Sequence, residues 1–204
     1  MGLDSFLFTT ADVTNLSWDT YNEAKKDRYS RKVVITFSDE TSKQVKAYEI
    51  QTFILKTGEQ YSVWEIKNIT SKGNITFLYW EENGTEPKKK QINVSSLKAV
   101  RYTHAYWRKA NQIHQYFVDT IQNGEDDCGD YDISGDQLFD LIELCLKVLR
   151  ERNSKLAQKK LPTQAGFFFG STDYDNWYYT DLENTVKQLA DVKANQTYTY
   201  TSSW

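Results

Sequence analysis

Hydrophobic and polar positions divide the chain near residue 104, where a pattern typical of strands gives way to one typical of helices. From Lys32 to Thr103, β-branched and aromatic runs such as Val33–Phe37 and Ile75–Trp80 alternate with polar turns. Asn83-Gly84, the strongest hairpin signal, follows the second of these runs. The block therefore predicts five or six strands in an antiparallel meander.

The second half of the chain has a helical period. Apolar residues recur at helical spacing through Tyr106–Val118, which predicts a helix that Asn123-Gly124 ends. Ser134 and Gln137 have the spacing of a capping box and predict the start of a second helix with one apolar stripe. A third helix is expected from Trp177 to about Val192.

The remaining segments are shorter. Residues 3–8 predict a strand, and Asp19–Arg28 predicts either a short helix or a solvated loop. Arg150–Lys160 has the composition of a basic linker, and residues 195–204 are expected to fray. Gly166–Gly170 predicts a buried strand or a tight turn, with its three phenylalanines in the core.

Together these elements predict one α+β domain spanning residues 1–204. Its antiparallel β-meander, residues 32–103, is expected to pack with a helical C-terminal half, residues 104–194.

Composition narrows the class of protein. A net charge of −3 argues against general nucleic-acid binding, which needs a positive field. Two cysteines are too few for a disulfide framework. The first residues lack the pattern of a signal peptide, and no apolar run is long enough to cross a bilayer. We therefore expect a cytosolic protein that neither enters a membrane nor carries a cofactor.

Five separate stretches, in a fixed order, carry a resemblance to a known family. They are Met1–Asp4, Trp107–His114, Asp126–Gly129, Leu161–Thr163 and Gly166–Asp175. In these stretches the chain resembles a family of small proteins from tailed phages and prophages, whose typical members are shorter. The resemblance covers about the first eight residues and residues 105–186. It implies a setting in the bacterial host cytosol, no particular activity, and a β-rich block that is an elaboration of this member.

Accessory phage genes often encode proteins that bind and block host factors. By that analogy the resemblance implies an accessory protein that binds and inhibits a host or phage protein. The components of anti-phage defence, which anti-CRISPR proteins block, are among the candidate targets.

Aromatic residues flanked by charges in the β-rich block are the candidate protein interface. The candidate residues are Tyr61, Trp64, Tyr79, Trp80, Glu81, Glu82, Lys88, Lys89 and Lys90. The alternative is that these aromatics pack the sheet onto the helices.

A second hypothesis is binding, sequestration or cleavage of a small phosphorylated molecule, such as a nucleotide signal. Arg108 and Lys109 would bind its phosphate, and Trp107 or Tyr174 its base. Arg108, Asn111 and His114 would then form a polar cluster that binds an anion or transfers a proton. Alternatively, His114 is a core histidine bonded to a carboxylate, with Arg108 paired to Asp126 or Asp127.

The sequence offers little support for catalysis or metal binding. Cys128 follows Asp126 and Asp127, whose charges disfavour a thiolate. Asp130–Gly135 imitates half of a calcium loop, but Leu141 occupies the place of the bidentate glutamate. We therefore predict a protein without catalytic turnover and without a metal site.

Overall fold

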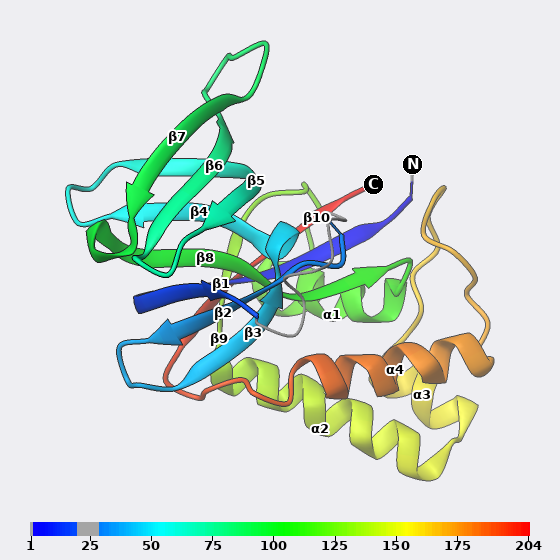
Figure 1. The fold of residues 1–204 in the computed structure, drawn as a ribbon. Helices are drawn as coiled ribbons and strands as arrows, with labels where there is room; N and C mark the ends of the chain where they lie inside the picture. The colour runs from blue at the N-terminus through cyan, green and yellow to red at the C-terminus, as the bar shows by residue number, and fades with distance from the viewer. Residues whose placement is uncertain (1, 20–28) are drawn as a thin grey trace. The chain divides into compact units, whose positions relative to one another are not determined.

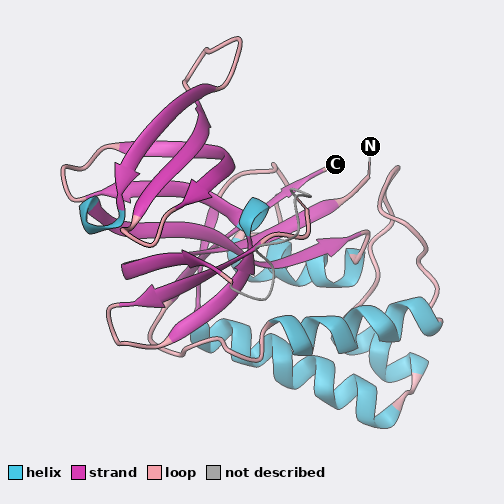
Figure 2. Ribbon diagram, in the orientation of Figure 1, coloured by secondary structure: helices cyan, strands magenta, loops and turns pink. Residues whose placement is uncertain are grey.

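The computed structural model describes residues 2–19 and 29–204 (Figure 1). Within these residues the chain forms ten β-strands and four α-helices, and the strands pair in antiparallel fashion (Figure 2). The predicted α+β class with antiparallel strands is confirmed. The chain divides into two compact units: unit 1 comprises Met1–Thr9 and His104–Trp204, and unit 2 comprises Thr10–Thr103.

Unit 2 is built from strands joined by short turns. Two of its strands, β1 (Asp4–Trp18) and β8 (Leu97–Arg108), also contribute residues to unit 1. The others are β2 (Lys32–Phe37), β3 (Ser42–Lys46), β4 (Ile50–Leu55), β5 (Gln60–Ile69), β6 (Asn74–Trp80) and β7 (Lys88–Asn93). The strand order is β3-β2-β1-β8-β4-β5-β6-β7.

The hairpin between β6 and β7 is where the sequence placed it. Asn83 has a φ of 65°, which is the left-handed conformation that its Asn-Gly pair favours. Strand β1 is longer than predicted, because Val13 and Leu16 are buried as it pairs with β2. For this reason unit 2 begins at Thr10, well before Lys32. Residues 20–28, on which the expected helix or loop falls, lie outside the described residues.

The core of unit 2 is apolar and aromatic. Fully buried side chains alternate along β2 and β6, as expected of strands with one face turned inward. Phe53 and Phe77 meet edge to face, with ring centroids 4.9 Å apart. Tyr61 packs in the same way on Phe77.

Unit 1 combines strands with all four helices. Its remaining elements are α1 (Asn111–Ile121), β9 (Tyr131–Ser134), α2 (Gly135–Glu151), α3 (Ser154–Lys160), α4 (Asn176–Gln188) and β10 (Thr197–Ser203). β10 lies between β1 and β9, and its Tyr198 and Tyr200 are buried in the core. The expectation that residues 195–204 fray is therefore wrong.

The prediction that a helix begins at Tyr106 is also wrong for its first turn, which is part of a strand. Tyr106–Arg108 ends β8, where Ala105 and Trp107 are buried while Tyr106 and Arg108 are exposed. That alternation has the strand period of two. Lys109, with a φ of 59°, redirects the chain before α1 begins at Asn111.

The capping box at the start of α2 is confirmed. The backbone N–H of Gln137 donates to the Ser134 hydroxyl, and the Gln137 side chain accepts from the Ser134 backbone. The predicted stripe is buried at Leu138, Leu141, Cys145 and Val148. The expected linker 150–160 instead contains α3, whose first turn Asn153 caps.

Candidate functional site

Trp107 and Asn111, two of the candidate ligand residues, are buried and bonded within unit 1. The indole N–H of Trp107 donates to the Thr185 hydroxyl at 2.9 Å, and its ring lies in the core rather than facing a ligand. The Asn111 amide donates to the carbonyls of Phe169 at 3.0 Å and Ser171 at 2.9 Å. Its own oxygen accepts from the backbone N–H of Gln164 at 3.0 Å.

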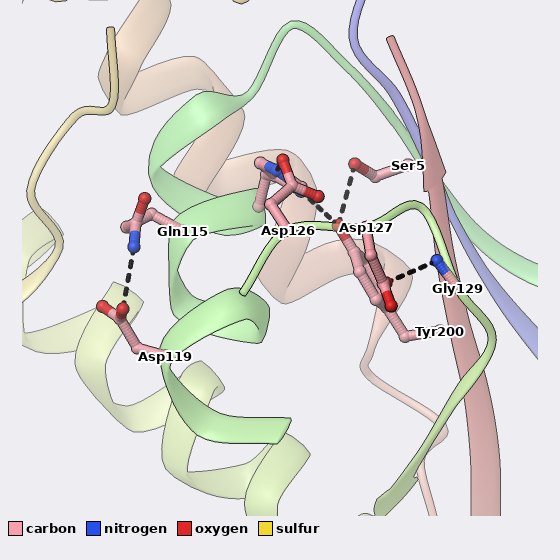
Figure 3. A network of polar contacts seen from close by, with 8 residues as sticks. Ser5, Gln115, Asp119, Asp126, Asp127, Gly129 and Tyr200 are labelled. Atoms are coloured by element: carbon pink, nitrogen blue, oxygen red, sulfur yellow. Dashed lines mark hydrogen bonds and ion pairs between the residues drawn. The ribbon is translucent and has the colours of Figure 1, made fainter. Parts of the chain in front are cut away.

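His114 is buried in a polar chain that crosses unit 1. Because a carboxylate only accepts, the Nε2–H donates to Asp126 at 2.8 Å. In the neutral imidazole, Nδ1 then accepts from the Tyr200 hydroxyl at 2.6 Å. Figure 3 shows the contact of Tyr200 with Ser5, 3.1 Å away. His114 is thus a core histidine bonded to a carboxylate, and Ser5 at the other end of this chain is itself buried.

Arg108 is exposed and pairs with Asp4 at 3.3 Å, not with Asp126 or Asp127 as the sequence alternative had it. The Tyr106 hydroxyl donates to the same carboxylate at 2.5 Å. Since Arg108, Asn111 and His114 each bond to different groups, the structure does not bring them together as a cluster.

A cleft of about 350 Å³ in unit 1, here called the α4 cleft, does contain Arg108 and Lys109. It is also lined by Gln112 from α1 and by Asp175, Trp177 and Asp181 at the start and on the first turns of α4. Asp173 and Tyr178 complete this side. The other candidate, Tyr174, packs its ring on Tyr178 and receives a hydrogen bond from the Thr163 backbone.

Asp175 positions the exposed indole of the α4 cleft. Its carboxylate caps α4 by accepting from the backbone N–H groups of Trp177 at 2.9 Å and Tyr178 at 3.1 Å. Tyr178 then faces the core, whereas Trp177 is 77% exposed. Asp181 follows one turn later, and desolvation raises the pKa of its carboxyl group despite a hydrogen bond from Gln112.

The charges in the α4 cleft do not favour an anion. Three carboxylates line it against two cations, and one of those cations, Arg108, is already paired with Asp4. Sequence reasoning missed Gln112, Trp177 and Asp181. One signal was available: Trp177 falls outside the core positions of its helix, and Asp181 is its i+4 neighbour.

The candidate interface residues of unit 2 lie on two faces of the sheet. Tyr79 and Lys88 are directly opposite on β6 and β7, and the Lys90 ammonium donates to the Tyr61 hydroxyl. Trp80 is the next residue after Tyr79 and points the other way. A bulge in β5 turns Trp64 to that second face, where its ring is 5.9 Å from Trp80.

Four of the five charged residues of this interface are exposed at the β6–β7 hairpin, and the fifth, Lys90, is partly buried. Glu81 forms an ion pair with Lys88 at 2.6 Å. Glu82 and Lys89 are exposed, and Trp64 is 43% exposed.

The phenylalanines of Gly166–Gly170, here called the Phe turn, overturn the expectation that all three are core. Phe169 is buried, with its ring 5.4 Å from His114. Phe168 is partly exposed, and Phe167 is 92% exposed. The reason is the tight turn itself: the N–H of Phe169 donates to the Gly166 carbonyl, so one ring points inward and the other two point out.

Among the described residues, no group of three or more His, Cys, Asp or Glu side chains is placed to hold a metal ion. No helix in the described ranges is long and apolar enough to cross a membrane.

Comparisons with models of protein families, with curated proteins and with solved structures each found no match.

Proposed function

We propose that this protein binds a second protein, which it contacts by inserting Phe167 of the Phe turn into an apolar pocket. The observation that carries the proposal is the 92% exposure of Phe167 on a turn that is otherwise firmly held. Leaving such a side chain in water forgoes about 1.5–3 kcal/mol of burial free energy. Aromatic anchors of this kind dominate the energetics of protein interfaces.

The backbone of the Phe turn is fixed from several directions. Asn111, which is 1% exposed, bonds to backbone groups on both sides of the turn. The Phe168 carbonyl accepts from the N–H of Leu3 at 3.3 Å. Gly170 has a φ of 92°, a conformation that favours glycine. A partner would therefore meet a pre-organised anchor and would not have to order it.

The resemblance to phage proteins supports a bacterial host protein as the partner, with inhibition of that protein as the outcome. The exposed ring of Phe168 is 4.5 Å from that of Phe167 and would extend the same contact. The candidate residues of unit 2, including Trp64 and Trp80, are the competing surface for the same function.

Affinity capture from a bacterial host lysate tests the proposal with three matched variants. Phe167→Ser removes the anchor, Phe139→Ser makes the same change at an exposed phenylalanine of α2, and Trp64→Ser tests the surface of unit 2. We expect one partner to be retained by the native chain, Phe139→Ser and Trp64→Ser, and lost by Phe167→Ser. With the purified partner, Phe167→Ala should weaken binding by about 2 kcal/mol or more.

Two outcomes contradict the proposal. If Trp64→Ser loses the partner and Phe167→Ser keeps it, the interface lies on unit 2. If the native chain itself retains no protein, the proposed function is wrong. Size-exclusion chromatography with light scattering identifies a second copy of this chain, should that be the partner.

A further inference from the structure

The α4 cleft carries an uncompensated negative charge at its helix side. Asp173, Asp175 and Asp181 all line it. Asp175 uses one carboxylate oxygen to cap α4, and among the described residues no ion pair engages Asp181. The half-buried carboxylate of Asp181 therefore lacks the cation that would offset its desolvation.

Gln112 is the second and independent observation. This side chain is 2% exposed, yet it lines the same cleft. Its amide N–H donates to Asp181 Oδ2 at 3.2 Å, which leaves the amide oxygen without a hydrogen bond in the described part of the chain. This oxygen is not one of the enclosed side-chain atoms that lack a partner, so it is open to the cleft, where a donor group of a ligand can replace water.

Trp177 supplies an aromatic face beside these two acceptors. It precedes Asp181 by four residues, so the two side chains share one face of α4. An indole ring is the aromatic group that attracts cations most strongly. A carboxylate, an amide oxygen and an indole together match a positively charged group that also donates hydrogen bonds.

We infer that the α4 cleft binds a small organic ligand through a protonated alkylammonium group, held by Asp181, the Gln112 amide oxygen and the Trp177 ring. The volume of about 350 Å³ is within the range of small-molecule sites. Lys109 lies in the same cleft and disfavours a second cationic group on the ligand. This inference does not depend on the Phe turn or on a protein partner.

The test uses butylammonium, with 1-butanol as its uncharged counterpart and inorganic phosphate as the anion. The ¹⁵N-labelled full chain is titrated with each, and the indole N–H signal of Trp177 is assigned by its loss in Trp177→Phe. We expect butylammonium to shift this signal saturably, and we expect neither 1-butanol nor phosphate to do so at the same concentrations.

Asp181→Asn should weaken butylammonium binding at least tenfold. Glu183→Gln, which removes a carboxylate two residues along α4 that pairs with Arg152 outside the cleft, should leave binding unchanged. If Asp181→Asn fails to fold, Trp177→Ala replaces it, because that side chain is exposed, and the side-chain amide of Gln112 becomes the reporter.

Equal shifts by 1-butanol, a response to phosphate alone, or no response to butylammonium would each overturn the inference. Undiminished binding by Asp181→Asn, or by Trp177→Ala in its place, would do the same.

Discussion

The two units bury different kinds of side chain. In the described part of the chain, the buried polar residues of unit 1 are Ser5, Thr9, Asn111, Gln112, His114, Gln122, Thr185 and Ser202. In the described residues of unit 2, the buried polar residue is Asp19, and the rest of the core consists of aliphatic and aromatic groups. Apolar cores tolerate exchange of side chains of similar volume, whereas a buried polar group depends on specific partners. The comparison indicates that unit 1 adds specific hydrogen bonds to its apolar core, whereas unit 2 depends almost entirely on packing.

The largest expected effect is in unit 2. Phe53 is fully buried against Phe77, so Phe53→Ala should lower the free energy of unfolding by about 3–5 kcal/mol through the cavity it leaves. Phe53→Leu, which fills most of that volume, should cost less. Urea unfolding followed by circular dichroism measures both. A loss as large for leucine as for alanine would contradict the packing account.

Thiol labelling sharpens the same experiment, because both cysteines of the chain belong to unit 1. Cys145 is fully buried, which shields its thiol from reagent and raises its pKa to about 12, so it reacts only when unit 1 opens. We expect Phe53→Ala to accelerate labelling of Cys145 less than it raises the unfolded fraction of unit 2. Equal changes would show that the two cores unfold as one.

The next largest effect is expected at Asn111 in unit 1. Asn111→Ala leaves two carbonyls and one N–H of the 164–171 backbone without their partner, which should cost about 2–4 kcal/mol. Asn184→Ala, at an exposed position of α4, is the matched control and should change stability by under about 0.5 kcal/mol. Urea unfolding of both variants checks the prediction, and similar small losses would refute the role given to Asn111.

The smallest effect is expected from removing one tyrosine hydroxyl in each unit. Tyr200→Phe keeps the ring that stacks on Phe117 but removes the hydroxyl that bonds to His114 and Ser5. It should cost about 1–2 kcal/mol, because buried partners are left unsatisfied. Tyr61→Phe in unit 2 should lower the free energy of unfolding by less. The hydroxyl of Tyr61 donates to Glu59, which is exposed and can bond to water instead. Thermal unfolding of the two variants measures both losses of stability. A larger loss for Tyr61→Phe than for Tyr200→Phe would contradict the difference drawn between the units.

Local signals in the sequence correctly predict structures that form between residues close together along the chain. The capping box at Ser134 and the hairpin at Asn83 involve residues within a few positions, and both formed as expected. Tyr106–Arg108 is too short for its period to be decisive alone. Tyr198 and Tyr200 are ordered through pairing with β1, nearly the whole chain away, which no local pattern can indicate.

The same limit applied to the candidate site. Residue type alone predicts Arg108 and Lys109 as phosphate ligands, and the two do lie in one cleft. Residue type also predicts Asn111 and His114 as ligands, but their hydrogen-bond partners come from the Phe turn, from the segment after α1 and from β10. Trp177 and Asp181 form a candidate site only together with Gln112, which lines the same cleft but lies more than about 60 positions earlier in the sequence. Such pairings depend on the tertiary fold.

The position of β10 has a consequence for synthesis on the ribosome. All of unit 2 is a continuous segment, so it has every strand it needs once Thr103 has left the exit tunnel. Unit 1 must wait for β10, about 100 residues later, which takes roughly 5–20 s at bacterial and eukaryotic elongation rates. During that interval the first residues of β1, Asp4–Phe8, have no β10 to pair with. The nascent chain thus passes through a stage in which unit 2 is complete while β1 has an unpaired edge of the kind that promotes aggregation.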